Sequence, residues 1–174
     1  MSRVYTLLPA IILFILIFSS ENIYYNNDNF FSDIGNSLNV EFIRDGDLYF
    51  IDRNSVIKKI EIEIAKKDSE KINGLKFRSS IKEDTGMLFL LRDQEEYKII
   101  NIKGVRKFLD IIYIDEYNTI IFIDKNVNPI KEMEIPDLYP SIVKYVLEIN
   151  AGMAEKWKIK EGFRVNYFLD KKNI

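Results

Sequence analysis

The sequence predicts a mainly β protein, in which an antiparallel β sandwich or barrel-like domain with two short helices follows an N-terminal hydrophobic helix. Short runs rich in Ile, Val, Tyr and Phe recur with turn residues between them, a spacing typical of all-β domains. Hydrophobic residues make up 47% and aromatic residues 13% of the 174 residues, enough for a sizeable core. The stretch Leu109–Asp124 has the pattern of a β-hairpin. Its first run is apolar on both faces, so we expect it to lie centrally in the sheet.

The composition restricts the chemistry that this chain can perform. It has no Cys and no His, which excludes disulfides, thiol nucleophiles, Ser-His-Asp triads and the usual zinc and iron sites. We therefore predict no cofactor and no metal site. Lys+Arg number 25 and Asp+Glu 27, so the net charge is -2 and gives no electrostatic reason to expect nucleic acid.

Residues 1–20 have the pattern of a targeting segment. Arg3 precedes the apolar run Leu7–Phe18, and two serines follow it, as in a secretory signal peptide. The run is shorter than the roughly 20 residues of a spanning helix. The large residues Ile17 and Phe18 lie near the possible cleavage positions. A cleaved signal peptide and an uncleaved N-terminal membrane anchor therefore both remain open.

The rest of the chain divides into two parts. Residues 21–39 are polar and rich in Asn, which predicts a tether, and residues 40–174 form a single β-rich domain. The basic residue before the apolar run places this domain outside the cytoplasm. We expect an exported protein, either periplasmic or anchored in the inner membrane.

The first half of the predicted domain contains a hairpin, a strand and a helix. The hairpin covers Val40–Ile51, because Asp45-Gly46-Asp47 is a strong turn signal between two apolar runs. Ile57–Ala65 alternates between apolar and charged residues, which predicts a strand with one buried and one solvent-exposed face. A short helix over Asp68–Ile72 follows and ends at Gly74.

The second half is predicted to be mostly strands around the central hairpin. Asn118 can adopt the left-handed conformation that closes this hairpin. Gly152–Lys158 is predicted to be the second short helix. The other strands are predicted over four apolar runs: Gly86–Leu91, Tyr97–Ile102, Ile142–Asn150 and Gly162–Leu169.

Four motifs occur in order along this domain: Gly74-Leu75 with Arg78, Gly86–Phe89, Leu109–Asp115 and Val146–Gly152. Their order and spacing resemble the prokaryotic family called domain of unknown function 192, over about residues 59–169. The resemblance implies a compact β-rich domain, usually behind a signal peptide or anchor, with no established activity. The family's Phe-Trp-Met-Lys-Asn-Thr segment corresponds here to Ile100–Val105, in which only Lys103 matches.

The candidate binding residues are Arg78, Lys103, Asp110 and Glu148. Asp110 shares a strand face with apolar residues, so we expect it to be partly buried and to need donors, which Arg78 or Lys103 could supply. That cluster could bind an anionic or sugar ligand; alternatively, Asp110 forms a structural ion pair or caps loop amides. Glu148 shares a face with Lys144, and a solvent-exposed strand face is the simpler interpretation.

These observations favour an uncharacterised exported or membrane-anchored β domain that binds a ligand or protein at the cell envelope. The expected partners are the membrane, if the N-terminal segment is uncleaved, and an unknown envelope ligand or protein. The alternative is an enzyme that uses carboxylates and cations on an envelope glycan or another small ligand, with Asp110 or Glu148 as acid or base. That alternative requires Asp110 and a second carboxylate to share a concave pocket.

Overall fold

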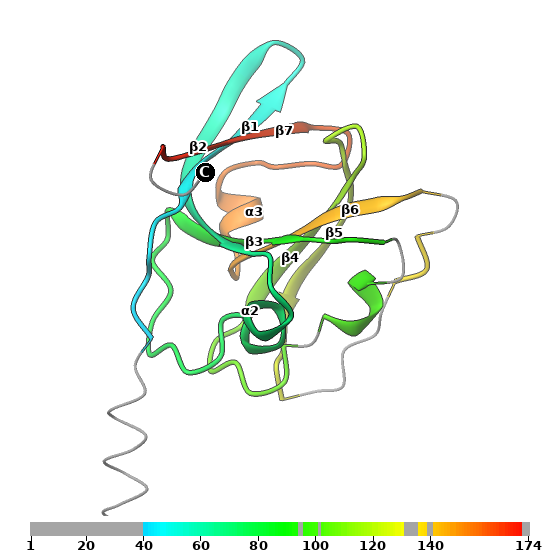
Figure 1. Cartoon of the computed structure of the whole chain (residues 1–174). Helices are drawn as coiled ribbons and strands as arrows, with labels where there is room; N and C mark the ends of the chain where they lie inside the picture. The colour runs from blue at the N-terminus through cyan, green and yellow to red at the C-terminus, as the bar shows by residue number, and fades with distance from the viewer. Residues whose placement is uncertain (1–39, 94–95, 101, 131–135, 139–140, 172–174) are drawn as a thin grey trace, which may run out of the picture. The chain divides into compact units, whose positions relative to one another are not determined.

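The computed structural model describes residues 40–93, 96–100, 102–130, 136–138 and 141–171. The predicted signal or anchor (1–20) and tether (21–39) lie outside the described residues. Within the described part, no helix is long and apolar enough to cross a membrane. Its regular elements are shown in Figure 1: β1 (Gly46–Asp52), β2 (Ser55–Ala65), α2 (Asp68–Asn73), β3 (Thr85–Leu90), the 3₁₀ helix η1 (Glu96–Ile99), β4 (Leu109–Asp115), β5 (Ile120–Val127), β6 (Val143–Asn150), α3 (Met153–Lys156) and β7 (Arg164–Leu169).

The strands form one seven-stranded sheet in the order β5-β4-β6-β3-β2-β1-β7, which confirms the mainly β prediction with two short helices. The sheet is mixed rather than wholly antiparallel: every neighbouring pair but one is antiparallel, as the prediction of a mostly antiparallel domain requires. β2 and β3 run parallel, with Glu63 opposite Met87. The long connection between them, which contains α2, brings the chain back to the level of Glu61, where β3 begins at Thr85.

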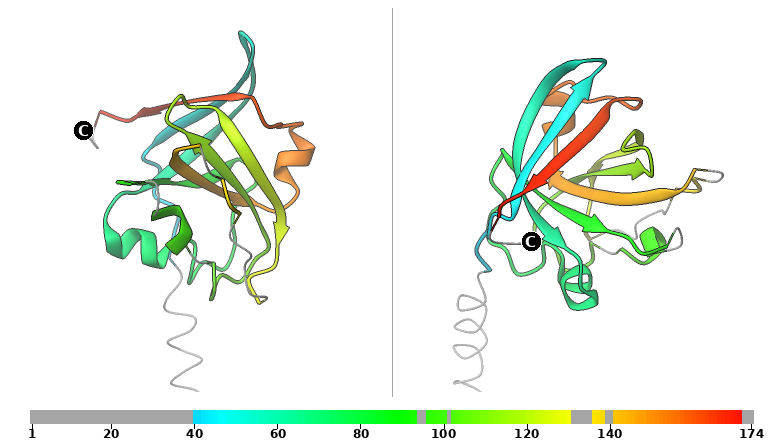
Figure 2. Two further views of the ribbon diagram at one scale, coloured as in Figure 1. Left: turned by 90° about the vertical axis from the view of Figure 1, so that its right-hand side faces the viewer. Right: turned by 45° about the horizontal axis from the view of Figure 1, so that its top comes forward.

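The sheet curls so that its two edges meet. Thr119, just before β5, forms a bridge with Arg164 at the start of β7. Ile120 N donates to Phe163 O, and Val165 N donates to Asn118 O, each over 2.8 Å. Two views in Figure 2 show the curvature that results. The curled sheet therefore has an inner face and an outer face.

Each face of the sheet carries its own apolar core. Because side chains alternate along a strand, β3, β4 and β6 contribute to both cores. The run at the start of the Leu109–Asp124 hairpin is thus covered on both faces, as predicted. The inner core includes Leu48, Phe50, Ile60, Ile62, Leu88, Ile112, Leu147 and Ile149. The outer core includes Leu75, Met87, Phe89, Tyr97, Ile102, Ile111, Tyr113 and Val146.

Two predicted elements differ in the structure. The hairpin over Val40–Ile51 is absent, and the first hairpin turns instead at Arg53, between β1 and β2. Gly46 is the first residue of β1 rather than part of a turn. A glycine is required there because β7 passes so close that a Cβ would lie 2.1 Å from Phe168 O. The strand predicted over Tyr97–Ile102 is replaced by η1. The helix at Asp68–Asn73 and the left-handed Asn118 are confirmed.

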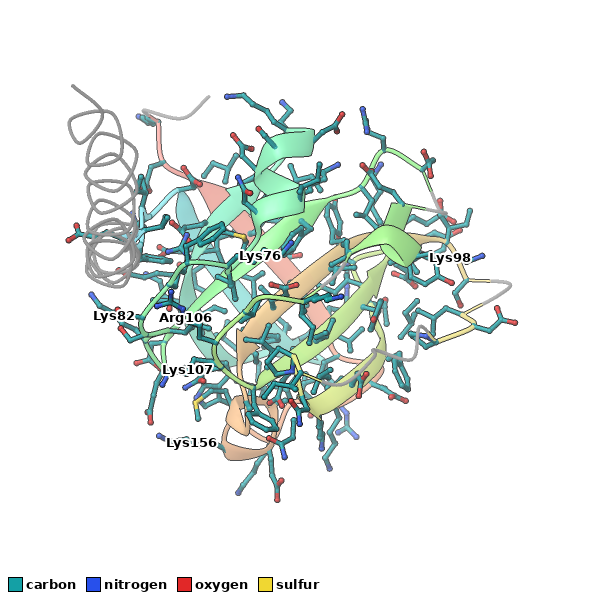
Figure 3. The ribbon with its side chains drawn as sticks, turned by 90° about the horizontal axis from the view of Figure 1, so that it is seen from below. Lys76, Lys82, Lys98, Arg106, Lys107 and Lys156 are labelled. Carbon is teal, nitrogen blue, oxygen red and sulfur yellow. The ribbon has the colours of Figure 1, made fainter. Side chains whose placement is uncertain are left out.

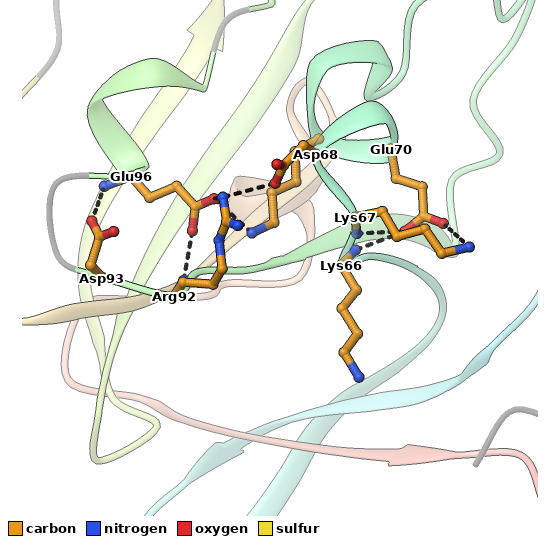
Figure 4. Close-up of polar contacts among 8 residues, drawn as sticks. Lys66, Lys67, Asp68, Glu70, Arg92, Asp93 and Glu96 are labelled. Atoms are coloured by element: carbon orange, nitrogen blue, oxygen red, sulfur yellow. Dashed lines mark hydrogen bonds and ion pairs between the residues drawn. The ribbon is translucent and has the colours of Figure 1, made fainter.

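An ionic cluster around the buried Glu96 carboxylate favours η1 over a strand at this position (Figure 4). The Glu96 carboxylate accepts hydrogen bonds from Lys71 Nζ over 2.8 Å and from Arg92 N over 2.6 Å. Arg92 also reaches Asp68 at the start of α2, over 2.8 Å. Burial disfavours the charged form of Glu96, but the hydrogen bonds from Lys71 and Arg92 outweigh it and lower the pKa of Glu96. The cluster ties η1 to α2 over the outer core.

Candidate functional site

The candidate site is a row of side chains across the outer face of the sheet. Glu63 of β2 lies opposite Met87 of β3, and Met87 lies opposite Glu148 of β6. Ile111 of β4 continues the row beyond Glu148. Both carboxyl groups are buried, with 6% of Glu63 and 2% of Glu148 exposed. Two acidic groups in an apolar core need an explanation, because each is costly to bury without partners.

Glu148 is the most perturbed group of the row. Burial raises its pKa to about 8, and the nearby Lys76 ammonium only partly opposes this effect. Its Oε2 atom has no hydrogen-bond partner within the described residues. The interpretation of Glu148 as part of a solvent-exposed face is therefore wrong. The segment after α2, beginning at Gly74, covers the outer face of β6, which no pattern within the strand reveals.

Gly74 lies directly over Glu148. Its backbone has φ 49° and ψ −133°, a conformation essentially confined to glycine. A Cβ at this position would lie 3.3 Å from the Phe89 ring and 3.8 Å from Glu148 Oε2. The absence of a side chain therefore lets the chain end α2 and pass close over the buried carboxyl group.

We expect Gly74→Ala to lower the free energy of unfolding by about 1–3 kcal/mol, because it adds backbone strain and crowds Phe89. Urea unfolding followed by circular dichroism measures the change. Gly162→Ala is the matched control, since Gly162 also has a positive φ of 85° but nothing within 4 Å of its Cβ position. If Gly74→Ala and Gly162→Ala lose the same free energy of unfolding, crowding of the outer core by the added Cβ contributes nothing to the loss.

At the other end of the row, Glu63 forms a buried ion pair with Arg78. Arg78 Nη2 lies 2.6 Å from Glu63 Oε2, and each side chain is 7% exposed. Glu63 Oε1 also accepts a 2.6 Å hydrogen bond from Ile43 N, which holds the first described segment against the sheet. Burial raises the pKa of Glu63 despite the pull of Arg78 and Ile43 N in the opposite direction. Arg78 Nε has no hydrogen-bond partner within the described part of the chain.

This ion pair lines a pocket of about 350 Å³ between the segment 40–45 and the segment 73–78. Asn73, Lys76 and Met87 also line it. Phe77 lies on its wall, 43% exposed, with a left-handed backbone at φ 65°. A bulky residue with positive φ is strained, and such strain is concentrated at functional sites.

The sequence matches the family model DUF192, described as "Uncharacterized ACR", over residues 49–167. The chain belongs to this family. The match confirms the resemblance found in the sequence, and the domain is called the DUF192 domain below.

Two crystal structures are similar to the DUF192 domain. One is a protein from Sinorhizobium meliloti 1021 that is named as a candidate transcription regulator. It is 26% identical with a TM-score of 0.62, and the match covers 74% of this chain and 98% of that one. The other is a protein of unknown function from Novosphingobium aromaticivorans DSM 12444. It is 25% identical with a TM-score of 0.58, covering 69% of this chain and 83% of that one. No curated protein matches the sequence.

The DUF192 domain does not bring the four predicted site residues together. Asp110 lies on the inner face and is fully buried. Its donors are the backbone amides of Asn126 and Ala154, each at 2.9 Å, and this matches the alternative in which it caps amides. Arg78 and Glu148 lie on the outer face, and Lys103 lies in an exposed turn.

The same geometry bears on the enzyme alternative. Asp110 lies opposite Ile149, one residue along β6 from Glu148, so the two carboxyl groups point to opposite faces of the sheet. They cannot act on one substrate as a pair. Within the described residues, no group of three acidic side chains is placed to hold a metal ion.

Sequence reasoning missed three residues of this region: Glu63, Lys76 and Phe77. Glu63 was assigned to the solvent-exposed face of its strand because it alternates with isoleucines. Lys76 lies between Gly74-Leu75 and Arg78, and its place in the lining of the pocket follows only from the tertiary structure. The positive φ of Phe77 leaves no trace in the sequence.

Proposed function

We propose that this DUF192 domain is a binding module held at the cell envelope by its N-terminal segment, and that its ligand is a small hydroxylated molecule of the cell-wall saccharide class. The ligand would occupy the pocket beside Glu63 and Arg78. The sequence of residues 1–20 supports the location, and the composition of the pocket supports the ligand class.

The observation that carries the proposal is the combination of groups around the pocket. The Glu63–Arg78 pair supplies a donor and an acceptor whose orientations are fixed by burial. Asn73 adds an amide that can both donate and accept. The Phe77 ring adds an exposed apolar surface against which the C–H face of a sugar can pack. Convergent polar groups beside an aromatic ring are typical of small-molecule sites.

Phe77→Gly tests the proposal because it separates binding from folding. It removes the ring, while glycine adopts φ 65° without strain, so the relief of backbone strain offsets part of the lost apolar burial and the variant should remain folded. We expect N-acetylglucosamine oligomers or muramyl dipeptide to bind the wild-type chain in isothermal titration, with at least a tenfold loss of affinity in Phe77→Gly.

Tyr117→Ala is the control, because Tyr117 is also an exposed aromatic, at 72%, but lies in the turn between β4 and β5. It should bind like the wild type. The proposal is wrong if no saccharide binds, or if Phe77→Gly binds as tightly as the wild type while remaining folded.

A further inference from the structure

One end of the sheet, which we call the basal end, carries a group of cations. β3 and β4 begin here and β6 ends here, since Leu109 lies opposite Asn150 and Gly86 opposite Ile149. The loops that lead into β3 and β4 carry three exposed cations: Lys82, Arg106 and Lys107. Figure 3 shows them on the face seen from below.

No described residue pairs with the side chains of these three cations. Within the described residues, the side chains of Lys82, Arg106 and Lys107 have no ion-pair or hydrogen-bond partner. The two acidic residues that follow Lys82 already have partners. Glu83 pairs with Lys156 of α3, and Asp84 pairs with Lys58. Among the described residues, the basal end therefore presents three cations without an ion-pair partner, although Lys82 lies in a pocket whose acidic residues Glu61, Glu83 and Asp84 pair with other cations.

An exposed aromatic residue lies beside these charges. Phe108 follows Lys107 directly and is 45% exposed, and its carbonyl is held by Ala151 N over 3.1 Å. Aromatic rings next to cations are characteristic of protein surfaces that contact the interface of a lipid bilayer. A surface that binds only soluble anions has no need of an exposed aromatic ring.

The chain also enters the DUF192 domain close to this end. Val40 N, at the first described residue, donates to Phe77 O over 3.4 Å. Lys76, the residue before Phe77, packs its aliphatic chain against Gly104, with its Cδ atom 3.7 Å from the Cβ position of that glycine. Gly104 lies two residues before Arg106 in the chain. Val40, the first described residue, thus lies on the same side of the domain as the segment that carries Arg106 and Lys107.

We infer that the basal end docks on the anionic surface of the membrane that holds the N-terminal segment. The inference rests on the anchoring in the proposed function but not on its ligand. A tether keeps the domain at high local concentration near the bilayer, so a few weak contacts are enough to orient it. Each Lys or Arg near an anionic surface changes the docked population about fivefold, so the three together contribute about a hundredfold.

The experiment uses the full chain reconstituted in lipid nanodiscs of phosphatidylcholine alone or of phosphatidylcholine mixed with phosphatidylglycerol. Hydrogen–deuterium exchange is followed in peptides that cover residues 80–84 and 104–108. We expect slower exchange of these peptides in the anionic discs at low salt. High salt should remove the difference, because it screens exposed charges beyond a few ångströms.

The test variant combines Lys82→Gln, Arg106→Gln and Lys107→Gln, which should remove the lipid-dependent protection. The matched control combines Lys144→Gln, Lys160→Gln and Arg164→Gln, which removes the same charge from exposed positions. These lie at the other end of β4, where Ile114 lies opposite Tyr145 and Ile120 N bonds Phe163 O. The control should keep the protection.

Three results would overturn the inference: equal exchange in the two kinds of disc, loss of protection in the control variant, or protection of the same peptides by duplex DNA but not by anionic discs. Failure of the chain to remain with either disc during flotation would overturn the anchoring itself. The saccharide titration of Phe77→Gly is independent of all these outcomes.

Discussion

Asp110→Ala is expected to lower the free energy of unfolding by about 3–5 kcal/mol, the largest loss of stability expected for any substitution in this chain. Asp110 is fully buried at the start of β4. Its two oxygens accept hydrogen bonds from Asn126 N and Ala154 N, each over 2.9 Å. Alanine leaves the buried amide of Ala154 and the partly buried amide of Asn126 without this acceptor, and bonds to a charged acceptor contribute more than neutral ones.

The two amides belong to segments that Asp110 holds in place. Asn126 has a left-handed backbone at φ 57°, near the irregular pairing of β4 with β5. Ala154 lies in the first turn of α3 and is itself part of the inner core. Losing the carboxylate therefore releases the irregular end of β5 and the first turn of α3 together.

Chemical unfolding in urea, monitored by far-UV circular dichroism, measures this effect. Asp110→Asn should fall between the wild type and Asp110→Ala, because the amide keeps one acceptor oxygen but presents a donor to the other N–H. Glu161→Ala, at an exposed position, should change stability by less than about 0.5 kcal/mol. A loss in Asp110→Ala no larger than in Glu161→Ala would show that Asp110 does not hold these segments.

The second large effect is a dependence of stability on pH that comes from Glu148. Its pKa is about 8 in the folded protein, against an ordinary value of 4.5. Between these two pH values the folded state binds one more proton than the unfolded state, so stability falls as pH rises. The contribution of Glu148 to the free energy of unfolding is fully present below pH 4.5 and is lost by pH 8. The total change is about 4–5 kcal/mol.

Glu148→Gln should remove this dependence while preserving the shape of the side chain. We expect the variant to be more stable than the wild type at pH 9 and close to it at pH 4. The difference between the two proteins in free energy of unfolding, plotted against pH, isolates the titration of Glu148. Glu63 and the other carboxyl groups with shifted pKa values remain in both proteins.

Urea titrations at a series of pH values provide the test, with Glu155→Gln as a control at an exposed position. A constant difference between Glu148→Gln and the wild type at every pH would mean that Glu148 does not titrate with a raised pKa. The same result would remove the reason for treating the outer row as unusual.

Much of the fold could be predicted because it depends on local patterns. The helix after β2 has an exit glycine, and the central hairpin has Asn118 in a left-handed conformation. Both features depend on a few neighbouring residues. The predicted strand at Tyr97–Ile102 failed because Lys71, 25 residues before Glu96 in the chain, donates to the Glu96 carboxylate and favours a tight turn there.

The candidate site could be predicted only in part. The prediction that Asp110 is partly buried and needs donors is confirmed for the donors, and the burial is complete rather than partial. Its donors are backbone amides rather than Arg78 or Lys103, because the side chain faces the inner core while Arg78 lies on the outer face. Alternation within a strand separates the two faces, but it does not say which chain segment covers each one.

The sequence by itself determined the family, the mainly β class and most of the strands, since these follow from residue order and periodicity. The tertiary structure alone decided that β2 and β3 are parallel and that Glu63 and Glu148 are buried in one row. The reason is physical: burial and pairing depend on contacts between distant segments. Here the segment after α2, passing over the sheet at Gly74, turns two apparently exposed carboxyl groups into buried ones.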